Sequence, residues 1–366
     1  MEDIQQFEHC RLSSIYFKRK FVLTWCPCWS WKYCRVGPIF CVLGCILLIY
    51  FLIMDILVYN SLQSITLMEP PNTSGYSPLR PLSVKLLMMD HMSHYIDNPI
   101  AEFVVSVFEP TGVYHVITPN VISITGLVLG FVSGKLVSMD SLNYRRIGVI
   151  IFQYRMWLDV LDGVVFRHTS GNPVYKSHRT SLGFFIDIDC DILSGVALAF
   201  GCLFYLWKNP PNVASRDLLP QTKPFLRGRE YEEDFQVKSF GAKATKNYIF
   251  LKALTFGVII LTASATWDNV VQAFVDLLQT PSATSVQTEK QTEALHSIVT
   301  FFSMYLWRFG SSQALLTMIQ IAVFADKIWE FLMFIPYAGF IGIAMLNCIS
   351  YIQIYHLRYD LEISPS

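Results

Sequence analysis

Long runs of apolar residues alternate with polar segments along the chain, a pattern typical of a protein that crosses a membrane several times. A spanning helix needs about 20 mostly apolar residues, and the first run, residues 36–59, has that length. Six further runs follow near residues 117–138, 145–166, 184–207, 248–267, 296–324 and 328–353. The pattern therefore predicts an all-α polytopic membrane bundle of about seven spans, one leading span and a six-span core.

The charges in the polar segments predict an orientation, because Lys and Arg favour the cytosolic side of a membrane. Residues 1–35 carry six Lys and Arg, so we predict a cytosolic N-terminus. Counting spans from there places the connection around Arg145 and the basic loop 208–247 in the cytosol as well. The segment 60–115, with a possible N-glycosylation sequon at Asn72, then lies in the lumen.

These segments define the domain organisation that we predict. It comprises a cytosolic segment 1–35, a leading transmembrane helix 36–59, a lumenal segment 60–115, a transmembrane core 116–353 and a C-terminal tail 354–366.

Composition supports a membrane class and narrows the partners. Of 366 residues, 53% are hydrophobic and only 15% are charged, whereas soluble domains carry about a quarter charged residues. The formal net charge of zero provides no basic field for nucleic acid, so membrane lipids are the expected surroundings. The cysteines around Cys26 and Cys28 are open to palmitoylation or metal binding.

Acidic residues are concentrated in the third and fourth apolar runs, where ionisable groups are costly and indicate function. Asp159 and Asp162 are three residues apart and Asp187 and Asp191 four apart, so each pair shares one helix face. Asp189 should point elsewhere. Converging carboxylates repel one another unless they bind cations, and an all-oxygen donor set suits Mg²⁺ or Mn²⁺. Structural ion pairs are the simpler alternative, but carboxylates outnumber cations on these faces.

Gly163 directly follows Asp162, and a glycine inside a helix suggests close approach by a ligand or by backbone. Arg167 lies one turn further on, where it is well placed to meet a phosphate group.

The order Asp159-x-x-Asp162-Gly163-x-x-Phe166-Arg167, followed by Gly183-x-x-x-Asp187-x-x-x-Asp191, resembles the motif of the CDP-alcohol phosphotransferase family. The resemblance covers about residues 116–353 and extends to the sequence Thr118-Pro119-Asn120, which is similar to the opening of the family's first core span.

The resemblance implies a site with two metal ions, Mn²⁺ or Mg²⁺. It implies that Asp159, Asp162 and Asp187 bind one ion and that Asp159, Asp187 and Asp191 bind the other. It places Asn120, Gly163, Arg167 and Gly183 at the nucleotide and its diphosphate. Asp187 and Asp191 are the implied catalytic residues, with Asp191 the base for the acceptor hydroxyl and His168 or His178 as alternatives.

Two departures from the common family pattern narrow the substrates. Phe166 stands where most members have a small residue, and the 15-residue stretch between Arg167 and Gly183 is longer than usual. Both features are similar to the insect branch of the family that makes ceramide phosphoethanolamine. That similarity implies CDP-ethanolamine as donor, ceramide as acceptor, a Golgi membrane location with a lumenal active site, Mn²⁺ and a possible homodimer.

Other functions remain open from the residues alone. Diacylglycerol is the nearest alternative acceptor, although Ile188 and Asp189 stand where diacylglycerol-using relatives generally have His-Gly. A synthase that uses CDP-diacylglycerol and a soluble acceptor would share the motif. A transporter or non-catalytic scaffold would need neither Gly163 nor four aspartates in this order.

Overall fold

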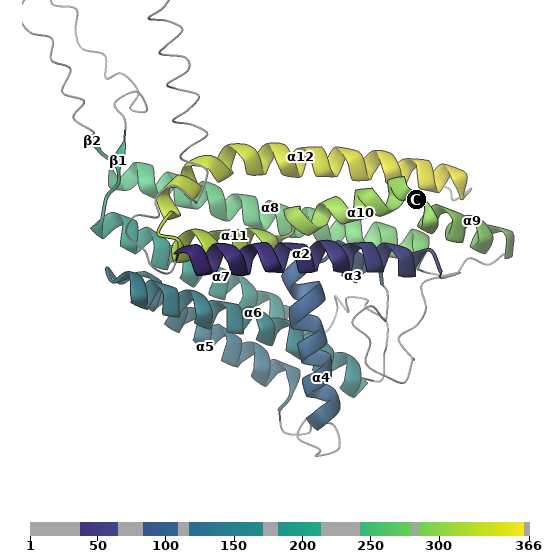
Figure 1. The fold of residues 1–366 in the computed structure, drawn as a ribbon, viewed down its shortest axis with the longest axis horizontal. Coiled ribbons are helices and arrows are strands. Elements are labelled where there is room, and N and C mark those ends of the chain that lie inside the picture. Colours follow the sequence, from purple (N-terminus) through teal and green to yellow (C-terminus); the bar gives the residue numbers. More distant parts are fainter. Residues whose placement is uncertain are drawn as a thin grey trace, which may run out of the picture. The chain divides into compact units, whose positions relative to one another are not determined.

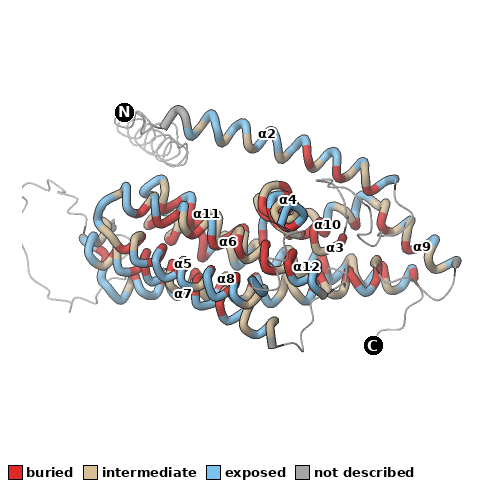
Figure 2. Tube along the Cα trace, turned by 90° about the horizontal axis from the view of Figure 1, so that it is seen from below, coloured by how far each residue is buried: buried red, intermediate tan, exposed pale blue. Residues whose placement is uncertain are grey.

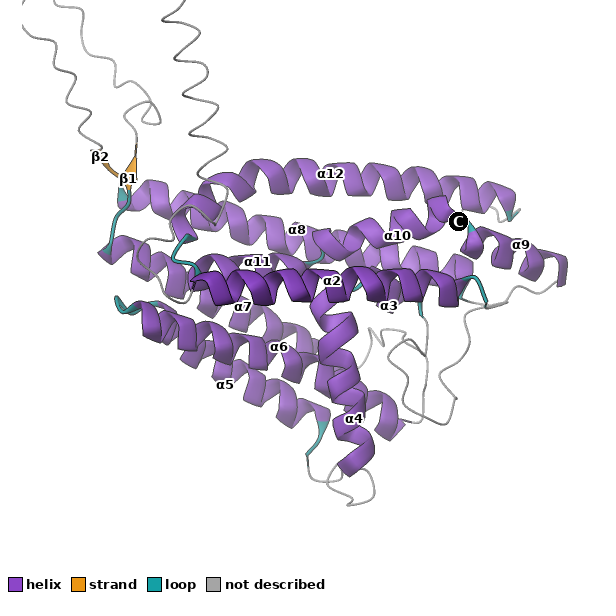
Figure 3. Cartoon of the chain, in the orientation of Figure 1, coloured by secondary structure: helices purple, strands orange, loops and turns teal. Residues whose placement is uncertain are grey.

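The computed structural model describes residues 37–64, 83–108, 117–170, 182–213, 242–279 and 285–361. Helices make up nearly all of these residues (Figure 3), and the protein is an all-α polytopic membrane protein, as the hydrophobic pattern predicts. The chain divides into two compact units, residues 1–58 and 59–366. The cysteine cluster, the sequon at Asn72 and His178 lie outside the described residues.

Five of the described helices are long and apolar enough to cross a membrane. The first is α2 (Gly37–Leu62), which is apolar on every side, as expected for a helix surrounded by lipid. The others are α5 (Pro119–Val137), α7 (Leu182–Lys208), α8 (Lys246–Leu278) and α12 (Ile328–Asp360). The helix α6 (Leu142–Ser170) has the length but carries the acidic residues of the motif.

The predicted span 296–324 is two helices, α10 (Ile298–Gly310) and α11 (Ser312–Phe324), and this corrects the prediction of one continuous run. Ser311 breaks the helix with an extended backbone, ψ 154°, and its side chain accepts a hydrogen bond from the Ala314 amide. A serine at an N-cap competes with the helical backbone in this way. Hydropathy could not reveal the break because both halves are apolar.

A turn at Asp326 separates α11 from α12, and the predicted boundary there is confirmed. Asp326 adopts a left-handed backbone, φ 59°. The amides of Lys327 and Asp326 donate to the carbonyls of Ala322 and Val323. These bonds satisfy the last carbonyls of α11 and let the chain reverse within three residues.

Glycines allow α5 to pack closely against α7. Gly130 lies against Ser194, and Gly134 lies against the backbone of Ala197 and Gly201. A β-carbon at Gly134 would overlap the Ala197 carbonyl oxygen. Small residues at four-residue spacing serve the same purpose in other membrane helix pairs. The result is a compact group of α5, α6 and α7 (Figure 1), which fixes the two helices that carry the aspartates.

The buried core lies between the long helices of the second unit, where the buried segments face one another (Figure 2). One apolar cluster includes Phe152 of α6, Leu198 of α7, Ile259 of α8, Ile319 of α11 and Leu332 of α12.

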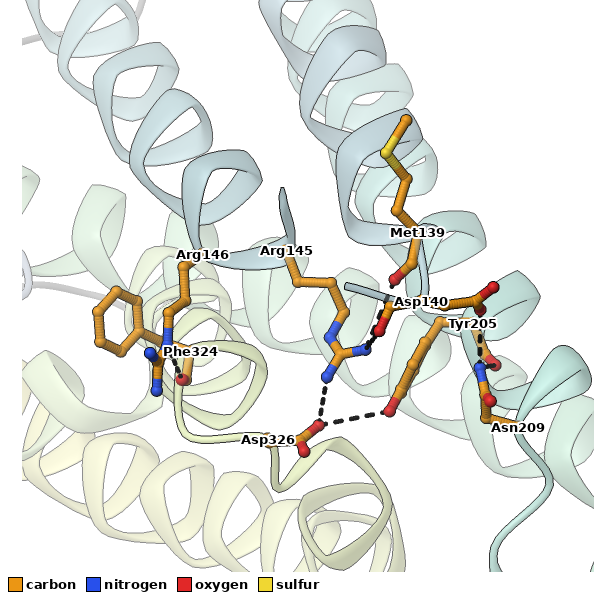
Figure 4. Close-up of polar contacts among 8 residues, drawn as sticks. All are labelled: Met139, Asp140, Arg145, Arg146, Tyr205, Asn209, Phe324 and Asp326. Atoms are coloured by element: carbon orange, nitrogen blue, oxygen red, sulfur yellow. Dashed lines mark hydrogen bonds and ion pairs between the residues drawn. The ribbon is translucent and has the colours of Figure 1, made fainter. Parts of the chain in front are cut away.

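Three interhelical connections of the second unit meet at one end of the bundle (Figure 4). Arg145 lies near the start of α6, is 2% exposed and pairs with Asp326 at 2.6 Å. The Arg145 guanidinium also lies over the Tyr205 ring of α7, 3.8 Å from its centroid. Lys208, at the end of α7, donates to the carbonyl of Ser138 at 3.2 Å. The α5–α6, α7–α8 and α11–α12 connections therefore lie at the same end.

The strands β1 (Asn212–Val213) and β2 (Ala242–Lys243) form a two-residue antiparallel pair beside this end. At the other end, α9 (Ser285–His296) contacts α8, and the Gln291 side chain donates to the Leu277 carbonyl at 2.8 Å.

The segment before the core is helical and packs onto it, which hydropathy does not indicate. It contains α3 (Val84–Met88), the π-helix η2 (Ser93–Asp97) and α4 (Asn98–Phe108). Arg308 of α10, 2% exposed, donates to the Leu87 carbonyl at 2.8 Å and to the Tyr95 hydroxyl at 2.7 Å. The Trp267 indole donates to the Met88 carbonyl at 3.0 Å. A segment predicted only as polar and lumenal is thus anchored against α8 and α10.

Candidate metal centre and active site

Three carboxylates from α6 and α7 converge in the second unit. Asp159, Asp187 and Asp191 each offer an oxygen, and these oxygens all lie within 4.8 Å of one another. Asp159 comes from α6, whereas Asp187 and Asp191 lie one turn apart on α7. The spacing of Asp187 and Asp191 predicted that they share one face of a helix, and in the structure that face meets Asp159 of α6.

Asp162 is at the edge of this group rather than within it. Its side chain is buried, 5% exposed, and its Oδ2 accepts a hydrogen bond of 2.6 Å from the Ser123 hydroxyl of α5. Asp162 still interacts electrostatically with Asp187 and Asp159. The four aspartates thus form one acidic cluster in which Ser123 orients Asp162.

Arg155 lies one turn before Asp159 on α6 and pairs directly with Asp191. The Arg155 side chain is only 5% exposed, whereas the Asp191 side chain is 37% exposed, so the pair is buried on the arginine side and open on the carboxylate side. The sequence analysis assigned no role to Arg155. Its four-residue spacing from Asp159 was the available clue to a position on the same face.

Arg167 and Gly163 lie on the same side of α6. The Arg167 guanidinium pairs with Glu102 of α4 at 3.5 Å. A β-carbon at Gly163 would lie 3.5 Å from Arg167 Nη1, an ordinary van der Waals distance. Packing among the described residues therefore does not require glycine at this position.

Asn120 and Gly183 are neighbours although 63 residues separate them in the sequence. A β-carbon at Gly183 would lie 3.3 Å from Asn120 Oδ1, closer than most side-chain contacts. The starts of α5 and α7 consequently approach each other here. Two residues that the resemblance placed at the nucleotide are adjacent in the fold.

The donor set fits a hard divalent cation. All three converging groups are carboxylates, the ligand type that Mg²⁺ and Mn²⁺ prefer. Asp187 Oδ1 is buried and has no hydrogen-bond partner within the described part of the chain. A buried, unpaired carboxylate oxygen is costly, and a cation at this point would satisfy it.

Other candidate residues lie away from the cluster. Asp189 is exposed, as its spacing predicts, and so are Phe166 and His168. The loop residues 171–181, including His178, are outside the described residues.

An apolar cavity of about 320 Å³ lies between α4, α5 and α6. Leu158 and Leu161, beside Asp159 and Asp162 in the sequence, form part of its wall, together with Val104 of α4. Ile122, next to Ser123, is also in the wall. The cavity is thus close to the acidic cluster and has the apolar lining expected for a hydrocarbon chain.

A carboxylate cluster between the helices of a membrane protein indicates a functional site, because ionisable groups are costly there. Comparison with known proteins identifies the family. The sequence profile of the ceramide phosphoethanolamine synthase family matches residues 71–359. A ceramide phosphoethanolamine synthase of Drosophila melanogaster is 31% identical over 281 residues, which cover 76% of this chain and 69% of the fly protein. The chain belongs to this family and is a transferase.

The match begins well before the core predicted at residue 116, so α3, η2 and α4 belong to the region shared with the family. No solved structure matches the chain.

Proposed function

We propose that the protein transfers phosphoethanolamine from CDP-ethanolamine to the primary hydroxyl of ceramide, giving ceramide phosphoethanolamine and CMP. The observation that carries this proposal is the convergence of Asp159, Asp187 and Asp191 in a member of this family. The acceptor comes from the name of the relatives, and the donor comes from the CDP-alcohol phosphotransferase motif.

Donor binding is assigned to residues on both sides of the carboxylates. Two divalent ions, held by the four aspartates, would neutralise the diphosphate and stabilise the departing phosphate of CMP. Arg167 supports the diphosphate, and Gly163 leaves room for the nucleotide. Asn120 and Gly183, which are adjacent, bind the cytidine side of the donor.

Asp191 is assigned as the base. It accepts the proton of the ceramide hydroxyl while that oxygen forms its bond to phosphorus, and the bond from phosphorus to the CMP oxygen breaks. Arg155 fixes the orientation of Asp191 through their direct ion pair. His168, exposed at the end of α6, is the remaining described alternative.

The apolar cavity beside Leu158 and Leu161 is assigned to an alkyl chain of the acceptor. It borders the helix turns that carry Asp159 and Asp162, so a chain inside it would hold the lipid's hydroxyl near the carboxylates. We also propose a Golgi location with the acidic cluster facing the lumen.

The test uses purified protein in detergent with Mn²⁺ and labelled CDP-ethanolamine, offered ceramide and diacylglycerol in parallel. Label in ceramide phosphoethanolamine alone supports the proposal. Label in phosphatidylethanolamine alone overturns the acceptor but keeps the donor. No transfer from CDP-ethanolamine to either lipid overturns the proposed function.

A further inference from the structure

One lysine from outside the motif acts on the acidic cluster. Lys85 of α3 interacts electrostatically with Arg167, Asp187, Asp268 and Asp159. Asp187 in turn interacts with Lys85 as well as with Arg155. Two of the three converging carboxylates, Asp159 and Asp187, therefore interact electrostatically with Lys85, which lies more than thirty residues before the predicted core at residue 116.

Lys85 differs from the other two cations of the site in its contacts. Arg155 pairs directly with Asp191, and Arg167 pairs with Glu102. Within the described residues, the Lys85 ammonium makes no hydrogen bond or ion pair of its own. It is half-buried. Partial burial removes part of the hydration of the Lys85 ammonium, and no direct partner among the described residues replaces the lost water. The ammonium therefore remains available to bind an incoming anion.

The backbone on which Lys85 stands is fixed. Ser83 caps α3 by accepting from the Leu86 amide at 3.2 Å, and Val84 and Leu86 on either side of the lysine are buried. Arg308 and Trp267 hold the carbonyls of Leu87 and Met88. Because α8 and α10 hold the C-terminal end of this short helix and Val84 at its start is fully buried, the backbone of the lysine is fixed in position.

We propose that Lys85 binds the diphosphate of the donor, on the α3 side of the site, as a partner to Arg167. This assignment rests on the proposed function and adds a residue to it. Before the donor binds, Lys85 and Arg167 repel each other. A diphosphate between them would relieve that repulsion and receive a charge-assisted hydrogen bond from the ammonium. The same contact stabilises the negative charge that develops on CMP as it leaves.

A purely structural role for Lys85 is the competing explanation, with Asp268 of α8 as its counter-charge. The two roles differ in their dependence on Asp268. If Lys85 only neutralises Asp268, then removing both charges should restore a functional protein. If it binds the diphosphate, the double change leaves the defect in donor binding.

The experiment measures CMP binding by calorimetry and transfer kinetics for wild type, Lys85→Met, Lys85→Arg and Lys85→Met/Asp268→Asn, all in detergent with Mn²⁺. Lys135→Met is the matched control, since Lys135 is an exposed lysine on α5. We expect Lys85→Met to weaken CMP binding and raise KM for CDP-ethanolamine by about tenfold or more. KM for ceramide should not change, Lys85→Arg should recover part of the affinity, and the double variant should stay defective.

Wild-type CMP affinity and donor KM in Lys85→Met, or recovery in the double variant, would overturn the assignment of Lys85 alone. A wild-type protein that neither binds CMP nor transfers label would overturn the proposed function and this assignment together.

Discussion

At the scale of single residues, Asp187 and Asp189 provide a matched pair on the same helix. Asp187 belongs to the converging group and has a buried, unpaired oxygen, whereas Asp189 is exposed. We expect Asp187→Asn to lower transfer by about a hundredfold or more, because it removes a metal ligand. Asp189→Asn should stay within about twofold of wild type.

Transfer rate and Mn²⁺-dependent thermal stability measure this difference. Wild type and Asp189→Asn should gain stability on addition of Mn²⁺, and Asp187→Asn should gain less. Equal activity of the two variants would contradict the assignment of the metal centre.

His94 gives the anchored segment a predictable pH dependence. Burial, and secondly the Arg308 guanidinium, hold the pKa of His94 well below its usual value of 6.5. Its Nδ1 lies 2.7 Å from Arg308 Nη2 and accepts a hydrogen bond as neutral imidazole. Because the unfolded chain binds this proton more readily, His94 makes stability fall as the pH decreases below about 6.5, by up to about 1.4 kcal/mol per pH unit.

We expect His94→Asn to lose this part of the pH dependence, since an amide oxygen can accept the same bond without titrating. The measurement is thermal unfolding in detergent between pH 5 and 8, about the range in which histidine titrates. The same slope in both proteins would show that His94 is not the group responsible.

At the scale of elements, the attachment of α3 and η2 to α10 is predicted to affect both stability and activity. Arg308→Met removes the donor to the buried Leu87 carbonyl and to Tyr95. Leaving such groups unpaired costs about 2–4 kcal/mol in total. If α3 carries Lys85 to the site, the donor KM should rise as well.

The control for this variant is Arg358→Met, near the end of α12, where the side chain is only partly buried. It should retain both stability and donor KM. If Arg308→Met is destabilised but keeps the donor KM of wild type, then the attachment of α3 to α10 contributes to stability and not to donor binding.

The cavity between α4, α5 and α6 makes a separate prediction for the acceptor. Val104 lines it, whereas Val107 on the same helix is 51% exposed and does not. Val104→Trp should fill part of the space and raise KM for ceramide by about tenfold, the equivalent of about two lost methylene contacts. Val107→Trp should not. Kinetics with varied ceramide at saturating CDP-ethanolamine give the answer, and a rise in donor KM instead would contradict the assignment of the cavity to the lipid chain.

The sequence predicted those features that depend on interactions between residues close together in the chain. Asp159, Asp187 and Asp191 were predictable because helical periodicity alone brings them onto facing sides. The break at Ser311 and the packing of α3 were not, because they depend on a capping bond and on Arg308, more than two hundred residues from Leu87. The contacts of Arg145 were not predictable either. The sequence shows it only as a positive charge of a connection, whereas in the structure it is buried and paired with Asp326.

At the scale of the whole molecule, the positions of the interhelical connections in the second unit indicate at which end of the bundle the acidic cluster lies. Within the core, this does not depend on counting spans. The α5–α6, α7–α8 and α11–α12 connections lie at one end. Asp159 is 14 residues beyond Arg145 on α6, about 21 Å along the helix. The acidic cluster therefore lies in the half of a bilayer core of about 30 Å that is far from these connections. If the connections are cytosolic, the site opens toward the lumen.

This geometry predicts latency in sealed Golgi vesicles that keep their cytosolic face outward. CDP-ethanolamine is charged and does not cross a bilayer unaided, so externally added donor should be used slowly until detergent or a pore-forming agent opens the vesicles. We expect transfer to ceramide to rise about tenfold or more on opening, while a protease added outside, without detergent, cleaves within the basic segment 208–247 that the sequence predicts to be cytosolic. The control is a lumenal enzyme whose latency reports the fraction of intact vesicles. Full transfer in intact vesicles would place the aspartates on the cytosolic side and the basic connections in the lumen, and would therefore contradict the predicted orientation of the core, whatever the acceptor proves to be.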